Sequence, residues 1–352
     1  MMQEIMSDAL LVAIIGLLGG VALGLAARLG RFCTLGAIED LLYGGDDLRI
    51  RMWLVALGVA IFGTYSLSGF GLLETQQAFY LSQTWNPLAS IIGGLVFGYG
   101  MALAGNCGFG ALARLGGGDM RSFVIVLVMG LASYVTLSGP LAKLRITVFP
   151  SEPVVGTPPG FAHSLASQTG LSTIPIGLCI GLLVLILALL SPNVRRSKEA
   201  LFWSVVVGLA IVSGWAGTQW VARHGFDVVP IVSHTFSAPI GETMLYAMTS
   251  SGSSVSFGTS SVFGVLLGSF IGSLIKGHFR WEACEDPREL RRQILGACMM
   301  GFGAVVAMGC SIGQGLSAFS LLAFSAPVTL AAIVIGAAFG LRQLIAGFEP
   351  KI

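Results

Sequence analysis

Charge is scarce in this chain of 352 residues, since only 10% of its side chains are Asp, Glu, Lys or Arg. A typical soluble domain has about 25% charged residues. Apolar residues make up 55% of the chain, and the mean hydropathy is +0.86. With 19 basic and 17 acidic side chains, a protein of 36.7 kDa has too few charged groups to form a surface that is exposed to water. Much of that surface must therefore face lipid. The composition excludes a disordered, collagen-like or ordinary cytosolic protein and predicts an all-α polytopic membrane protein.

Motifs for metals and cofactors are missing as well. The four histidines are dispersed, and the six cysteines include no Cys-x-x-Cys pair, so neither a zinc site nor a disulfide framework is indicated. The sequence has no Cys-x-x-Cys-His motif, no Walker A motif and no dinucleotide loop in a strand–helix setting. We therefore expect no metal and no cofactor. The acidic N-terminus MMQEIMSDAL lacks the positive region of a removable signal peptide.

Apolar stretches of helical length recur along the chain and predict about nine transmembrane helices. Four of the segments between them are apolar and glycine-rich, too long for tight turns and too short to span. Each is predicted to be a re-entrant half-helix, which survives at membrane depth only where protein or a cavity satisfies its backbone. The predicted spans are 9–28, 51–72, 86–105, 119–141, 172–191, 199–222, 257–277, 288–308 and 324–345, and the predicted re-entrant segments are 31–44, 106–117, 236–251 and 310–322.

The positions of lysine and arginine predict the orientation. Sixteen of the 19 fall after spans 1, 3, 5 and 7 or at the C-terminus, and the opposite side has only Lys143, Arg145 and Arg223. Because basic residues accumulate in cytoplasmic loops, this distribution predicts a cytoplasmic C-terminus and a periplasmic N-terminus.

An internal repeat divides the chain. Residues 93–113 and 296–316 align without a gap, and five spans separate equivalent points, so the two halves are predicted to have inverted topology. We expect a first repeat at 1–145 (spans 1–4), an outer loop and connector span 5 at 146–198, and a second repeat at 199–352 (spans 6–9). The identical pairs are Gly93/Gly296, Gly98/Gly301, Gly100/Gly303, Ala104/Ala307, Cys107/Cys310 and Gly110/Gly313, and the same offset pairs Glu39 with Glu242.

Three cysteines stand at the starts of predicted half-helices: Cys33 in GRFCTLG, Cys107 in GNCGFG and Cys310 in GCSIGQG. A helix start offers unpaired N–H groups and the positive end of a dipole, which favours an anion. A thiol beside those amides adds a soft, polarizable contact, so the combination suits an anion that contains sulfur, such as thiosulfate. Cys179, Cys284 and Cys298 do not share this position and are interpreted as small buried hydrophobic residues.

The motifs GRFCTLG, AGNCGFGALARLGGG and MGCSIGQGLSAFSLLA resemble the three cysteine motifs of the YeeE/YedE family of bacterial thiosulfate transporters, over nearly the whole chain. The resemblance implies an hourglass-shaped fold in the inner membrane and import of thiosulfate. It implies that the ion passes by S–H···S hydrogen bonds from Cys310 (outer) to Cys107 (middle) and Cys33 (inner). It also implies the bilayer and a cytoplasmic TusA-like sulfur carrier as partners, and no nucleic acid. The second motif departs from many relatives, which have threonine after the cysteine.

Other polar residues are weaker candidates. Glu39 and Glu242 occupy equivalent places in half-helices and suggest proton coupling, although we favour carboxylates bonded to nearby backbone N–H groups. His224 and His234 are placed in an outer connection, where they could attract an anion, and a solvated loop is the favoured interpretation. The neighbours of the motif cysteines predicted to line the path are Asn106, Gly108, Ser311 and Gln314.

The sequence is compatible with three other readings. The cargo could be another sulfur or selenium species, such as sulfite, polysulfide or a selenite-derived ion. The chain could instead be a membrane sulfurtransferase that forms a persulfide on Cys107 or Cys310. A structural subunit of a redox complex is disfavoured, because no cofactor motif supports it. We expect a transporter rather than an enzyme.

Overall fold

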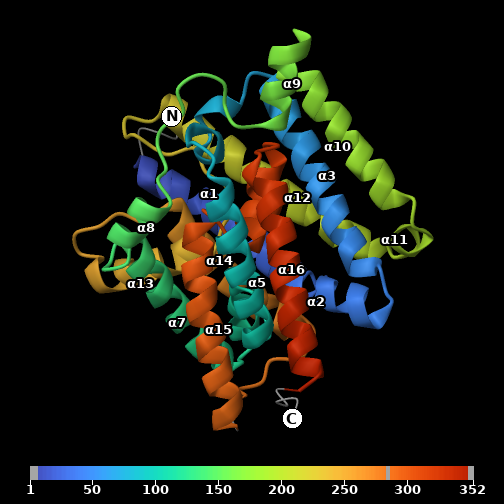
Figure 1. Cartoon of the computed structure of the whole chain (residues 1–352), viewed down its shortest axis with the longest axis vertical. Coiled ribbons are helices and arrows are strands. Elements are labelled where there is room, and N and C mark those ends of the chain that lie inside the picture. Colours follow the sequence, from blue (N-terminus) through green and yellow to red (C-terminus); the bar gives the residue numbers. More distant parts are fainter. Residues whose placement is uncertain (1–6, 283–285, 348–352) are drawn as a thin grey trace.

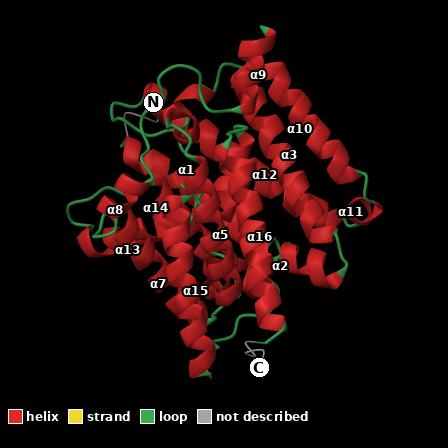
Figure 2. Ribbon diagram, in the orientation of Figure 1, coloured by secondary structure: helices red, strands yellow, loops and turns green. Residues whose placement is uncertain are grey.

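The computed structural model describes residues 7–282 and 286–347, and within these ranges every regular element is a helix (Figure 1, Figure 2). Nine helices have 17 or more residues and lie at the nine predicted positions. The largest disagreement is at the end of α7, which stops at Leu137 rather than at 141. These helices are α1 (Asp8–Arg28), α3 (Leu48–Gly69), α5 (Pro87–Ala104), α7 (Met120–Leu137), α10 (Thr173–Leu189), α12 (Lys198–His224), α14 (Phe257–Ile275), α15 (Pro287–Val306) and α16 (Ser325–Ile345).

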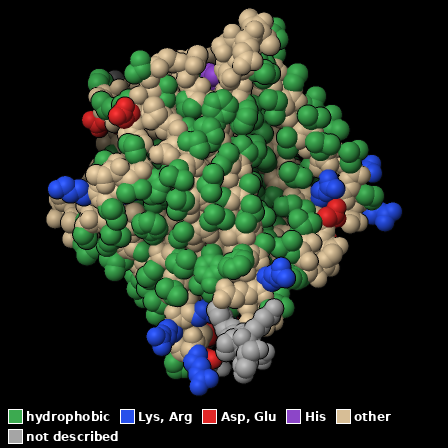
Figure 3. Space-filling view, viewed as in Figure 1, with side chains coloured by type: hydrophobic (Ala, Val, Ile, Leu, Met, Phe, Trp, Pro, Cys, Tyr) green, Lys and Arg blue, Asp and Glu red, His purple; other side chains and the backbone are tan. Residues whose placement is uncertain are grey.

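Seven helices of the described chain are long and apolar enough to cross a membrane, which confirms an all-α polytopic membrane protein. The other two long helices are α10, which is apolar but has only 17 residues, and α15, whose first turns contain Arg288, Glu289 and Arg291. The number nine for the membrane spans therefore stays a prediction. Hydrophobic side chains cover the middle of the face in Figure 3, and Lys and Arg lie toward its lower tip and side edges.

Polar caps and prolines fix where the long helices begin. Asn86 accepts hydrogen bonds from two backbone N–H groups of α5, and Pro87 occupies the first turn of that helix. Ser7, Asp119 and Ser256 cap α1, α7 and α14 in the same way. These side chains satisfy N–H groups that have no partner inside the helix.

All four predicted re-entrant segments form short helices. The first is α2 (Thr34–Glu39), which continues as the π-helix η1 (Asp40–Gly44), and the others are α6 (Gly108–Gly116), α13 (Ser237–Thr249) and the π-helical η3 (Gly313–Ala318). Short elements also occur in the connections: η2 (Thr75–Gln77), α4 (Phe79–Ser82), α8 (Ala142–Val148), α9 (Phe161–Thr169) and α11 (Pro192–Arg196).

Helix contacts come in matched pairs between the two halves. α1 packs on α14 as α12 packs on α3, and α5 packs on α16 as α15 packs on α7. The short helices follow the same rule, since α6 contacts α14 while η3 contacts α3. These are the pairs that the predicted repeat relates to one another. The inversion of the halves and their boundaries at 145 and 198 stay predictions.

Glycines bring the two central helices into backbone contact. A side chain at Gly93 of α5 would lie 2.7 Å from the Gly303 carbonyl of α15, and one at Gly303 would lie 2.6 Å from the Gly93 carbonyl. Gly100 and Gly296 approach each other in the same reciprocal manner. Such close packing of small residues is typical of membrane helices. The same applies where Gly20 of α1 meets Gly264 of α14.

Candidate functional site

The three motif cysteines occupy the same position in three separate half-helices. Cys33 and Cys107 directly precede α2 and α6, and Cys310 directly precedes the helical residues 311–312 that lead into η3. Each Sγ accepts a hydrogen bond from the backbone N–H three residues later. The donors are Gly36 at 3.5 Å, Gly110 at 3.4 Å and Gly313 at 3.4 Å. The thiols therefore cap the helices, a task usually performed by Ser, Thr, Asp or Asn. The Cys-x-x-Gly spacing common to the three motifs matches this geometry.

A residue in the left-handed region lies two positions before each cysteine. These residues are Arg31 with φ 55°, Gly105 with φ 76° and Met308 with φ 57°. The reversal ends one helix and lets the cysteine begin the next. For a residue other than glycine this conformation costs about 1–2 kcal/mol, and such strain occurs most often at functional sites.

Cys107 is the central thiol. It is fully buried, and its Sγ lies 3.9 Å from the hydroxyl of Thr34, the residue after Cys33. The hydroxyl of Ser311, the residue after Cys310, lies near the same thiol without completing a hydrogen bond. The thiols of both other motif cysteines lie in the surroundings of the Cys107 thiol. The structure thus places Cys107 between the starts of two other half-helices.

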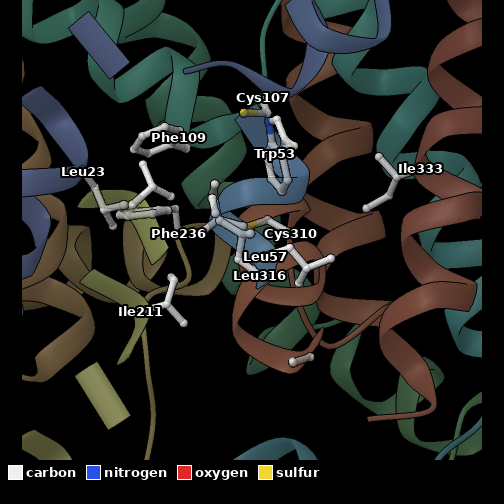
Figure 4. Close-up of a cluster of buried hydrophobic side chains, with 14 of the residues drawn as sticks. Leu23, Trp53, Leu57, Cys107, Phe109, Ile211, Phe236, Cys310, Leu316 and Ile333 are labelled. Carbon is white, nitrogen blue, oxygen red and sulfur yellow. The ribbon is translucent and has the colours of Figure 1, made fainter. Parts of the chain in front are cut away.

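Cys310 has a corresponding hydroxyl partner. Its Sγ lies 3.7 Å from the hydroxyl of Thr235, which precedes α13, and only 1% of the residue is exposed. Tyr80 of α4 lies next to both residues and is itself 8% exposed. Figure 4 shows Cys107 and Cys310 in one buried cluster with Trp53.

Two cavities approach the cysteines from opposite ends of α1 and α14. The Cys33-side cavity, of about 420 Å³, is lined by the end of α1 and by Cys33, Glu39 and Asn106. The Cys310-side cavity, of about 800 Å³, begins at the start of α1 and reaches Thr235 and Gly309 beside Cys310.

A closed region separates the two cavities. Cys107 and Cys310 line neither cavity. In the buried cluster that contains them, the rings of Phe109 and Phe236 lie 5.2 Å apart (Figure 4). The two cavities thus lie on opposite sides of a buried middle, and the hourglass shape stays a prediction.

The predicted path residues have different roles in this arrangement. Asn106 lines the Cys33-side cavity, and its buried Oδ1 atom has no partner. Gln314 has a structural role. Its Nε2 donates to the Ala307 carbonyl at 2.8 Å, and this bond satisfies a carbonyl group just after the end of α15, where the helix is broken. Gly108 packs against Met129, where a side chain would lie 2.5 Å from the methionine Cε atom.

The two glutamates line different cavities. Glu39 is exposed in the Cys33-side cavity, and Glu242 lies in the Cys310-side cavity next to Ser256. Among the described residues, neither carboxylate accepts a backbone N–H bond, so the structure does not support the favoured interpretation.

The histidine prediction was wrong for the second residue. His234 is not in a solvated loop: it is fully buried, and its Nδ1 lies 2.7 Å from the Ser261 hydroxyl. His224 is exposed at the end of α12 and stacks on Trp220.

The remaining cysteines also differ from their interpretation. Cys179 and Cys298 are exposed on α10 and α15 rather than buried. In a membrane protein an apolar side chain can face lipid instead of a core, which a rule derived from soluble proteins does not anticipate. Cys284 lies outside the described residues.

Sequence reasoning missed four side chains next to the thiols: Thr34, Thr235, Tyr80 and Trp53. Trp53 stacks on Phe32 at 5.0 Å, and its buried indole N–H has no partner. Thr34 could have been found, because it directly follows Cys33. The other three come from distant segments, and no spacing in the sequence marks them.

Comparison with known proteins finds a family model and relatives that match most of the chain. The family model described as sulphur transport matches residues 29–339. The thiosulfate transporter TsuA of Escherichia coli (strain K12) is 28% identical over 344 residues, which cover 91% of each chain. The thiosulfate transporter TsuA of Spirochaeta thermophila is 26% identical over 332 residues, covering 91% of this chain and 96% of the relative.

Proposed function

We propose that this chain, which belongs to the sulphur transport family, imports thiosulfate through the site formed by Cys33, Cys107 and Cys310. The family assignment makes it a transporter and not an enzyme. Both curated relatives described above are thiosulfate transporters, and they match this chain over nearly its whole length.

One observation supports the cysteine relay above all others. Cys107 is fully buried between Thr34 and Ser311, the residues that follow Cys33 and Cys310. An ion that moves from one cavity to the other along the half-helix starts meets the three thiols in the order Cys310, Cys107, Cys33. Each sulfur already accepts an N–H bond, so its own hydrogen can be donated to the ion.

The two ends of thiosulfate need different partners. Its sulfonate oxygens carry charge and suit the N–H groups at the starts of α6 and α13, whose positive dipole ends favour an anion. Its terminal sulfur is soft and suits a thiol. The rings of Phe109 and Phe236 pack against each other at a tilt close to these helix starts, which shields the passage from free exchange of ions.

Weak contacts fit a transport path. A hydrogen bond in a protein contributes about 0.5–1.5 kcal/mol net, and those of thiols are weaker than those of hydroxyls. Several such contacts in sequence let an ion enter and leave, as conduction requires. A sulfurtransferase would instead need one thiol to attack the S–S bond and retain the sulfur.

Import sets the orientation that we propose. The Cys310-side cavity faces the periplasm and the Cys33-side cavity faces the cytoplasm of a bacterial inner membrane. The 16-to-3 distribution of basic residues supports this choice. A cytoplasmic TusA-like sulfur carrier would then receive the ion from the Cys33 side.

Doubly labelled thiosulfate tests the function. The purified protein in proteoliposomes is given thiosulfate with ³⁵S in the terminal position and ¹⁸O in the sulfonate group. We expect both labels to arrive inside in a fixed ratio, because transport leaves the S–S bond intact. Label retained on the protein with sulfite left outside, and a protein mass increased by one sulfur atom, would instead establish the persulfide enzyme. Competition by sulfite and selenite in the same assay decides the cargo.

A further inference from the structure

Positive charge is concentrated around one cavity only. The Cys310-side cavity is lined by one cationic side chain, Arg145, and by the carboxylates Asp227 and Glu242. The Cys33-side cavity has a single carboxylate, that of Glu39. Against it stand five cationic side chains: Arg28, Arg31, Arg49, Arg114 and Lys276.

Three of these cations already have partners. Arg28 donates to the Ser273 hydroxyl at 2.6 Å, Lys276 donates to the Leu29 carbonyl at 2.8 Å, and Arg49 forms an ion pair with Asp40 at 3.2 Å.

Arg31 and Arg114 differ from them. Within the described residues, neither guanidinium has a hydrogen bond or an ion pair. Arg31 is also held in the left-handed region, at φ 55°, just before the Cys33 half-helix. Two unpaired guanidinium groups therefore line the same cavity.

A buried polar group adds an independent observation. Asn106 lines this cavity with 1% of its surface exposed, and its Oδ1 atom has no partner. The Oδ1 atom is an acceptor and does not bind an anion, but the NH₂ group of the same side chain can donate to one. The cavity of about 420 Å³ has room for a tetrahedral oxyanion together with several waters, each of which takes about 30 Å³.

We propose that the Cys33-side cavity is a binding site for divalent tetrahedral oxyanions, held by Arg31, Arg114 and Asn106. Guanidinium groups recognise the oxygens of such an ion and make no demand on its terminal sulfur. The site therefore accepts sulfate as well as thiosulfate. Provided that the chain imports thiosulfate as proposed above, sulfate bound there delays the release of the imported ion and slows uptake.

Sulfate binding to the full-length protein in nanodiscs tests the site without any transport. Calorimetry at low ionic strength compares wild type with the double variant Arg31→Gln/Arg114→Gln, and we expect the Kd for sulfate to rise at least tenfold. The matched control is Arg195→Gln/Arg196→Gln, which removes two exposed arginines of α11 outside the cavity, and its Kd should stay within twofold of wild type.

Unchanged sulfate affinity in the double variant would overturn the proposal. So would an equal loss in the control, which would indicate general attraction to basic surface. If the double variant does not fold, Asn106→Leu decides the question, because it keeps every charge and should still weaken sulfate at least fivefold.

A second measurement uses vesicles loaded with sulfate. The ratio of thiosulfate uptake in loaded and empty vesicles should fall below one half for wild type and stay near one for Arg31→Gln/Arg114→Gln. Sulfate binding without thiosulfate uptake would refute the proposed function and leave the site intact. Uptake that does not respond to trapped sulfate would refute the slowing of uptake by bound sulfate.

Discussion

At the scale of single residues, each motif cysteine combines a helix cap with a soft contact for the ion. The two roles can be separated at Cys107, whose Sγ accepts the Gly110 N–H at 3.4 Å. Serine is the better cap and is nearly isosteric, but its oxygen is harder and its bond to Cβ is shorter. Substitution by serine therefore keeps the first role and removes the second.

We expect Cys107→Ser to keep the melting temperature of wild type and to lose thiosulfate uptake at least tenfold. Cys107→Ala should lose uptake as well and also about 1 kcal/mol of stability, because the cap is gone. Uptake and thermal melting are measured on the same preparations, with Cys298→Ser on the exposed face of α15 as the control. Full uptake by Cys107→Ser would contradict the relay.

The glycine three residues after a cysteine gives a second prediction. A side chain at Gly313 would lie 2.5 Å from the Thr235 hydroxyl and 2.9 Å from that of Tyr80. Gly313→Ala should displace Thr235 from Cys310, reduce uptake severalfold and cost about 1–3 kcal/mol. The matched variant is Gly110→Ala, whose nearest contact would be 3.4 Å. Equal uptake by the two variants would show that Thr235 has no role.

At the scale of elements, the breaks between helices depend on a left-handed residue before each cysteine. Gly105 has φ 76°, and no atom lies within 4 Å of where its Cβ would be. Gly105→Ala should therefore destabilise the protein by about 1–2 kcal/mol through backbone strain alone. Thermal melting in detergent measures the effect. Gly252→Ala is the control, since that position is equally open and has no positive φ. Equal melting temperatures would argue against the strain.

At the scale of the whole molecule, charge determines how the chain sits in the bilayer. The basic cavity at the ends of α1 and α14 lies on the side that the 16-to-3 distribution assigns to the cytoplasm. A periplasmic phosphatase fused after the last residue should therefore remain in the cytoplasm and be inactive. The same phosphatase inserted in the loop around Val155 should reach the periplasm and be active. The reverse pattern would invert the proposed direction of both cavities.

The sequence alone determined the layout along the chain. Hydropathy depends on local composition, so the nine long helices were found with ends that differ by at most four residues. The positions of Cys33, Cys107 and Cys310 at half-helix starts also followed from the sequence, because short glycine-rich segments between long apolar ones have few alternatives.

Only the tertiary structure decided which distant groups meet. Thr235 reaches Cys310 across 75 positions of sequence, and the buried place of His234 depends on how its segment packs against α14. The unequal charge of the two cavities was hidden in the sequence, because Arg31, Arg114 and Asn106 stand in separate motifs. Contacts between segments depend on how helices pack, and periodicity within one segment contains no information about its neighbours in space.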